Sequence, residues 1–194
     1  MRGSDAAVVP AEVIRARAYL SRVAEPPAAA LVRFVDAMGP VAAAARVFAG
    51  DVPGDVAAET ASRRTVDHAE ADLAAARAAG ARLLVPEDVE WPHWAFAPFA
   101  LTRAPELAPP LALWVRGTRC LAEASDRGVA VVGARAATGY GTHVATEFGA
   151  GLAAAGATVV SGAAIGIDGA AHRGALAADG GTVAVLACCI HRIP

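Results

Sequence analysis

The sequence contains no lysine. Its 17 basic residues are all arginine and face 19 acidic residues, which gives a formal net charge of −2. A dedicated DNA-binding domain carries a clear basic excess, so a broad basic face is excluded. Any contact with nucleic acid must therefore be local.

Long apolar runs are also absent, although 56% of the residues are hydrophobic. Arg, Asp, Gly or Pro interrupts each run well before the roughly 18 residues that a transmembrane helix needs. The N-terminal stretch lacks the hydrophobic segment of a signal peptide. We therefore expect a cytoplasmic protein with a buried core and no membrane contact.

Cysteine is scarce and poorly spaced for a bridge or a metal site. Cys120, Cys188 and Cys189 are odd in number and include an adjacent pair, which suits neither a disulfide framework nor a CxxC site. Asp168 and His172 lack a third ligand of evident geometry, even if His191 is considered. We expect reduced thiols, no metal and no cofactor.

The stretch from Val129 to Pro194 carries the clearest pattern. Short apolar runs at 130–132, 158–160 and 182–187 alternate with longer segments rich in alanine and glycine. This alternation predicts βαβ units and a parallel sheet. Ligands of such sheets bind at the carboxyl ends of the strands. Glycines follow the first two strands, so we expect both glycine-rich loops to open onto one crevice.

Both glycine-rich loops have the chemistry of a phosphate site. Glycine lets the backbone approach an anion closely, and the start of a helix offers unpaired N–H groups. Arg135, Thr138 and Ser161 add side-chain donors, and Asp168 is expected to cap the helix that follows the second loop. Neither loop matches the G-x-G-x-x-G or Walker pattern. Tight turns without a ligand remain the alternative.

Two long motifs lie in this stretch, VVGARAATGYG at 131–141 and SGAAIGIDGAAHRGAL at 161–176. Together they resemble the paired signature of the DNA-processing protein A (DprA/Smf) family. The segments RARAYLSRVAEPP at 15–27, GARLLVPEDVEWP at 80–92 and PPLALWVRG at 109–117 extend the resemblance over nearly the whole chain. The arginine-only, alanine-rich composition fits an actinobacterium-like source with a GC-rich genome.

The resemblance implies a protein that binds single-stranded DNA in natural transformation. Members of the family protect incoming DNA, load the recombinase RecA onto it and form homodimers. We therefore expect single-stranded DNA and RecA as partners, and no enzymatic activity. The residues expected at the DNA are Gly133, Arg135, Thr138, Tyr140, Gly141, Ser161, Gly162, Gly166, Asp168, His172 and Arg173.

Three features depart from the family pattern. Ala164 stands where members often carry a basic or larger side chain, and Gly139 replaces another residue in the first loop. The closing segment CCIHRIP differs from the Cys-Gly-x-Asp-x-x-Tyr-Pro-like close of the family, and the family's further strands do not follow. We therefore expect a C-terminally truncated chain without the dimer surface.

The N-terminal region, residues 1–80, is expected to form a small helical domain of the SAM or helix-hairpin-helix kind. Proline and glycine pairs separate the expected helices, which are 11–23, 28–38, 41–49 and 55–79. The hairpin at Gly39 and Pro40 has no basic neighbour nearer than Arg33 and Arg46. A packing role is therefore favoured there over a phosphate contact.

Residues 81–127 are expected to form a connecting extension rich in proline and tryptophan, and residues 128–194 an incomplete Rossmann-like domain. The tryptophans of the extension could stack on unpaired bases. Packing in the core is favoured for four of its aromatic residues, namely Trp91, Trp94, Phe96 and Phe99. Alternation in LALWVRG predicts a short strand at the edge of the sheet.

The expected fold class is α/β, with a partial Rossmann-like parallel sheet preceded by a helical domain. Catalysis has little support, because Ser161 lacks the G-x-S-x-G elbow and Asp168 and His172 have no paired nucleophile. Two alternatives stay open. One is a nucleotide-binding or N-glycosidase-like Rossmann enzyme, although its Pro-Gly-Gly-x-Gly-Thr loop is missing. The other is an inactive fragment.

Overall fold

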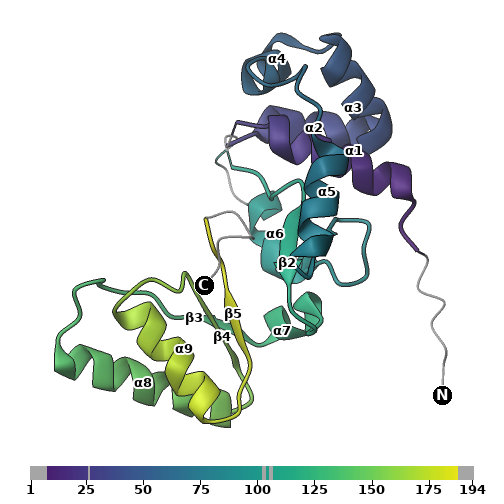
Figure 1. Ribbon diagram of the computed structural model, residues 1–194. Helices are drawn as coiled ribbons and strands as arrows, with labels where there is room; N and C mark the ends of the chain where they lie inside the picture. The colour runs from purple at the N-terminus through teal and green to yellow at the C-terminus, as the bar shows by residue number, and fades with distance from the viewer. Residues whose placement is uncertain (1–7, 26, 102–103, 105–106, 188–194) are drawn as a thin grey trace. The chain divides into compact units, whose positions relative to one another are not determined.

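The computed structural model (Figure 1) describes residues 8–25, 27–101, 104 and 107–187. This part of the chain divides between Thr118 and Arg119 into two compact units. The domain boundaries expected near residues 80 and 127 stay predictions. No helix within the described ranges is long and apolar enough to span a membrane.

Helices make up most of the N-terminal unit. The first five are α1 (Ala11–Val23), α2 (Ala29–Met38), α3 (Pro40–Ala49), α4 (Gly54–Thr60) and α5 (Ala69–Ala78). The first three match the expected helices to within one residue at each end. Gly39, with a φ of 79°, closes α2, and Pro40 occupies the first position of α3. Both residues take the positions that their backbone preferences favour.

The single helix expected at 55–79 is wrong, because α4 and α5 are separate. Between them the Tyr19 hydroxyl donates a hydrogen bond to the carbonyl of Arg64 (2.5 Å). The Asp67 side chain accepts one from the N–H of Ala69 (3.1 Å). These bonds hold the connection as a turn, and a side chain that bonds to nearby backbone competes with helix formation.

A two-stranded antiparallel sheet completes this unit, with β1 (Ala81–Leu84) paired to β2 (Leu113–Arg116). The strand predicted from LALWVRG is thus confirmed, but its expected place at the edge of the parallel sheet is wrong. Leu83 pairs with Trp114 across the two strands. The partner of a strand depends on such cross-strand contacts, which alternation along one strand does not reveal.

Helix α6 (His93–Leu101) lies between β1 and β2 in sequence. Of two tryptophans near its start, one is buried and the other is exposed. Trp91 is 4% exposed, and its ring lies 5.2 Å from that of the partly buried Phe96. The packing expected of both, and of the partly buried Phe99, is confirmed. Trp94 is 81% exposed, so the packing expected of it is wrong. A helix that is apolar on every side can bury only the side that meets its neighbours.

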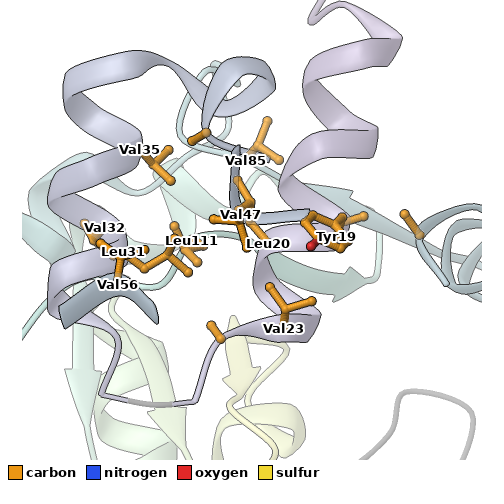
Figure 2. Close-up of a cluster of buried hydrophobic side chains, with 14 of the residues drawn as sticks. Tyr19, Leu20, Val23, Leu31, Val32, Val35, Val47, Val56, Val85 and Leu111 are labelled. Carbon is orange, nitrogen blue, oxygen red and sulfur yellow. The ribbon is translucent and has the colours of Figure 1, made fainter. Parts of the chain in front are cut away.

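The core of the N-terminal unit consists mainly of aliphatic side chains from α1 to α4. They are joined by Ala69 of α5, Leu83 of β1 and two residues that flank the strands, Val85 and Leu111. Figure 2 shows Tyr19, Leu20, Val23, Leu31, Val32, Val35, Val47, Val56, Val85 and Leu111. Burying one such aliphatic side chain completely contributes about 1.5–3 kcal/mol. Leu20, Leu31 and Val47 are 0% exposed, so each makes this full contribution.

The C-terminal unit is an α/β structure. Its elements are α7 (Leu121–Asp126), β3 (Gly128–Ala130), α8 (Gly139–Ala154), β4 (Thr158–Ser161), α9 (Ile167–Ala177) and β5 (Thr182–Ala184). All strands are parallel in the order β3–β4–β5, which confirms the predicted fold class. The first strand, expected at 130–132, lies at 128–130, and the last ends at 184 instead of 187.

Helices α8 and α9 pack against each other and against β4 (Figure 1). Two glycines let their backbones touch. A Cβ on Gly149 would lie 2.2 Å from the carbonyl oxygen of Ala171, and one on Gly174 would lie 2.0 Å from that of Thr146. A larger residue at either position would force the helices apart. Both helices begin at the carboxyl end of the sheet, because each follows one of two parallel strands that end there.

Candidate nucleic-acid interface

Two loops contact each other at the carboxyl ends of β3 and β4. The first loop is residues 131–138, and the second loop is residues 162–166. The N–H of Ile167 donates a hydrogen bond to the carbonyl of Ala134 (3.2 Å). Gly166 has a φ of 103°, and a Cβ there would lie 2.3 Å from the same carbonyl oxygen. Only glycine permits both this conformation and this approach.

Both loops line one open hollow of about 430 Å³, which we call the loop hollow. Its lining consists of Arg135, Ala136, Ala137, Thr142, Ala163, Ala164, Ile165, Gly166, Gly169 and Arg173. The expectation that the two glycine-rich loops open onto one crevice is thus confirmed. Neighbouring parallel strands end at the same edge of a sheet, which is why the loops meet there.

The loop hollow is lined by two arginines and by no acidic side chain. Arg135 is exposed, and Arg173 extends over Gly169, with its Nη1 atom 3.3 Å from where a Cβ would stand. Within the part of the chain that the structure describes, neither arginine forms an ion pair. Two guanidinium groups on a concave surface attract anions, and their planar shape suits phosphate oxygens.

Asp168 connects the two loops from the inside. It is 7% exposed, and its oxygens accept hydrogen bonds from the N–H groups of Gly133 and Gly162, both at 3.2 Å. Burial raises the pKa of a carboxyl group. Here the neighbouring Ser161 hydroxyl and the N–H groups of Gly133, Ala164 and Gly162 outweigh burial and lower the pKa of Asp168 below its ordinary value.

The helix-capping role expected of Asp168 is wrong. Helix α9 begins at Ile167, its N-cap is Gly166, and no side chain caps it. Asp168 therefore lies within the first turn and reaches back to the loops. The N–H groups of Gly133 and Gly162 suit phosphate, as the sequence indicates, but here they bind a carboxylate of the chain itself.

Other residues expected at the DNA have partners within the unit. The Thr138 side chain accepts a hydrogen bond from the N–H of Gly141 (3.1 Å) and caps α8. Ser161 is 3% exposed and donates to the carbonyl of Val131 (2.6 Å). Tyr140 is 78% exposed but is not part of the lining of the loop hollow. Arg135, Gly166 and Arg173 are the expected residues that the hollow brings together.

His172 faces the sheet. Its Nδ1 atom lies 2.5 Å from Oγ1 of Thr182, whose hydroxyl donates to the carbonyl of Val159 (3.0 Å). Since that hydroxyl proton is engaged, Nδ1 must be the donor, and Nε2 is buried without a partner in the described residues. Burial lowers the pKa of His172, against the opposing charge of Asp168 and the Ser161 backbone. The neutral ring adds no charge to the loop hollow.

The family described as DNA recombination-mediator protein A matches residues 82–194, more than half of the chain. The chain belongs to this family. Two similar proteins, from Mycobacterium tuberculosis strains CDC 1551 / Oshkosh and ATCC 25618 / H37Rv, are provisionally named DNA processing protein DprA. Each is 53% identical over 176 residues, which cover 89% of this chain and 45% of the relative. The chain thus spans less than half the length of these relatives.

The match to the recombination-mediator family includes both loops, so the resemblance carried by the two motifs is confirmed. Ala164, where the resemblance leads us to expect a basic or larger side chain, lines the loop hollow. Arg173 supplies a second guanidinium from α9, about two helical turns beyond the second loop. The hollow of this family member is therefore cationic despite the alanine.

Thr142 and Ile165 line the loop hollow of this recombination-mediator chain, although the sequence did not single them out. Thr142 follows Thr138 by four residues. Residues at this spacing lie on one side of a helix, so the spacing could have indicated that Thr142 lies next to the first loop. Ile165 is 86% exposed, and its size stands out in a run of small residues. Ala163 has a φ of 54°, which is uncommon without glycine and has no signal in the sequence.

Proposed function

We propose that this chain binds single-stranded DNA in the loop hollow, with Arg135 and Arg173 holding the DNA backbone. One observation carries the proposal: two exposed arginines without a carboxylate partner among the described residues share a concave surface that has no acidic lining. The family description, a DNA recombination mediator, supports nucleic acid as the ligand.

A single strand suits this site better than a duplex. A duplex is held by contacts to many phosphates along a rigid rod, whereas the loop hollow offers two cations at one place. A single strand bends its backbone into a concave site and leaves its bases free to stack. Tyr140, 78% exposed beside the first loop, and Ile165, 86% exposed within the second loop, offer apolar surface.

Fluorescence anisotropy with a labelled oligonucleotide tests this proposal. The chain should prefer a single strand to a duplex of equal length and should show little preference for sequence. Neutralising two phosphates gives a slope of roughly −1.4 for the logarithm of affinity against the logarithm of salt concentration. Binding that is independent of salt, or stronger to the duplex, would contradict the proposal.

We propose further that the bound strand is handed to the recombinase RecA during natural transformation. The family description as a recombination mediator and the DNA-processing name of the relatives support this role. A site with few contacts holds a strand weakly enough to release it. RecA-dependent ATP hydrolysis on an oligonucleotide covered by single-strand-binding protein should start sooner with the chain than with its Arg135→Ala variant.

A further inference from the structure

We propose that Asp168 is a positioning residue, whose carboxylate ties the first loop to the second and so sets the separation of Arg135 and Arg173. This inference rests on the proposed function. It gives Asp168 a different role from the direct DNA contact that the sequence motif suggests.

The two oxygens of Asp168 bind different loops. Oδ1 accepts from the N–H of Gly133, in the first loop, and Oδ2 accepts from that of Gly162, where the second loop begins, both at 3.2 Å. These glycines follow different strands, so one carboxylate joins the ends of β3 and β4. The neighbouring N–H of Ile167 adds a third tie, to the carbonyl of Ala134 (3.2 Å).

The backbone around Asp168 forms a cradle that fits its carboxylate. A Cβ on Gly162 would lie 3.1 Å from Oδ2, and one on Gly133 would lie 2.7 Å from the Ile167 side chain. Backbone N–H groups gathered in this way form an anion site. The chain itself supplies the anion, which leaves the arginines of the hollow without a carboxylate partner among the described residues.

Both arginines are placed through this tie. Arg135 follows Gly133 by two residues, and Arg173 follows Asp168 by five residues on α9. Asp168 itself is 7% exposed and is not part of the lining, so it does not touch a strand held in the hollow. Its charge alone would repel phosphate. Removing that charge would strengthen DNA binding by electrostatics, whereas loss of positioning would weaken it.

The opposite signs make Asp168→Asn the decisive variant. Asparagine keeps the size of the side chain but turns its NH₂ group toward one of the two N–H donors, which breaks that tie. We expect the affinity for a labelled single-stranded oligonucleotide to fall about tenfold, the loss of one charge-assisted hydrogen bond. Asp179→Asn is the matched control, because it removes the same charge from an exposed position in the same unit and should leave affinity unchanged or slightly higher.

A second readout needs no DNA. In the wild-type chain, the amide protons of Gly133 and Gly162 should exchange slowly with solvent, and in Asp168→Asn at least one should exchange faster. The amide of Gly151, on the exposed side of α8, should not change. Rapid exchange of both amides in the wild type would overturn the proposal even if the variant failed to fold.

The outcomes separate the two proposals. A wild-type chain that binds no single strand refutes the proposed function, while amide exchange still decides whether Asp168 ties the loops. If the wild type binds and a folded Asp168→Asn variant binds equally well or more tightly, the positioning role is wrong. A variant that is less stable but binds normally below its unfolding temperature would reduce Asp168 to a structural residue.

Discussion

The cationic character of the loop hollow depends on how one acidic residue is used. N–H groups of both loops satisfy both oxygens of Asp168. Burial raises the pKa of this carboxyl group, but the nearby Ser161 hydroxyl and these N–H groups outweigh burial and lower the pKa below its ordinary value. Arg135 and Arg173 therefore have no carboxylate to pair with in the hollow. A chain with a net charge of −2 can in this way present a local positive site.

Replacing Arg135 by alanine should weaken binding to single-stranded DNA. A charge-assisted hydrogen bond to phosphate is worth roughly 1.5–3 kcal/mol, so the affinity should fall about ten- to a hundredfold. Ala164→Arg, which adds a guanidinium to the lining of the same hollow, should strengthen binding. Fluorescence anisotropy at one fixed salt concentration measures both changes.

The matched control for Arg135 is Arg127→Ala in the same unit. Arg127 lies at the amino end of β3 and donates a hydrogen bond to the carbonyl of Ala155 (2.8 Å), at the opposite edge of the sheet from the loops. Its loss should leave affinity unchanged. Arg192, an arginine of the closing segment CCIHRIP, lies outside the described residues. An Arg135→Ala variant with a lower melting temperature and normal affinity would show that Arg135 is structural.

The buried ring of His172 should make stability depend on pH. Burial lowers its pKa in the folded state below the ordinary value of 6.5, so the unfolded chain takes up a proton first as pH falls. Stability is therefore full above about pH 6.5 and declines below it. Urea unfolding at pH 7.5 and pH 5.5 should show this loss in the wild type.

Two variants isolate the contribution of His172. His172→Gln keeps an N–H donor for Thr182 but cannot titrate, so its stability should change less between the two pH values. His143→Gln removes an exposed histidine of α8 and should keep the wild-type loss. An equal decline in all three proteins would assign the pH dependence to other groups.

Among the elements, the contact between α8 and α9 positions the loops. Both helices begin at the carboxyl end of the sheet. Arg135 lies there, in the loop before α8, and Arg173 lies about two helical turns into α9. Glycines at the crossing let the backbones approach until carbonyl oxygens touch the neighbouring helix. The abundance of glycine in this stretch is thus explained by packing as well as by the loops.

Gly174→Ala should destabilise the C-terminal unit. The added Cβ would lie 2.0 Å from the carbonyl oxygen of Thr146, a backbone atom that cannot move without separating the helices. Overpacking of this kind costs about 1–3 kcal/mol. Gly151→Ala, also in a helix but with nothing beyond the nearby backbone of its own helix within 4 Å of the new Cβ, should stabilise by about 0.5–1 kcal/mol. Chemical denaturation of both variants measures the difference, and equal effects would contradict this account of the crossing.

Local signals in the sequence are sufficient to predict several elements. Prolines and glycines mark the ends of α1, α2 and α3, and β-branched runs with glycine-rich connections mark the parallel sheet. These signals act within a few residues, because backbone preference and hydrophobic period are local properties. The meeting of the two loops also follows, since parallel strands share an edge.

The features that the sequence does not reveal depend on distant partners. The turn between α4 and α5 is held by Tyr19, whose partner Arg64 is 45 residues away. The pairing of β1 with β2 and the hydrogen bond from the Gly133 N–H to Asp168 likewise join separated segments. A residue type shows that a side chain can form such bonds, but only the fold selects the partner.

Across the whole molecule, the two units differ in how much core they bury. The N-terminal cluster combines side chains from several helices, whereas the described cluster of the C-terminal unit has Val159, Ala171 and Ala175 as its buried members. Buried apolar area is the main source of stability. The unit that holds the loop hollow should therefore open more readily than the other.

Binding of single-stranded DNA should protect the C-terminal unit selectively. A ligand that binds only the folded form adds about 2.7 kcal/mol of stability at a hundredfold excess over its Kd, and this gain belongs to the unit that contains the site. Hydrogen exchange followed by mass spectrometry should therefore slow in peptides from residues 119–187, most of all in the two loops, with little change in residues 8–118. The Arg135→Ala variant at the same DNA concentration should show much less protection. Equal protection of both units, or protection confined to the N-terminal unit, would move the DNA site away from the loop hollow.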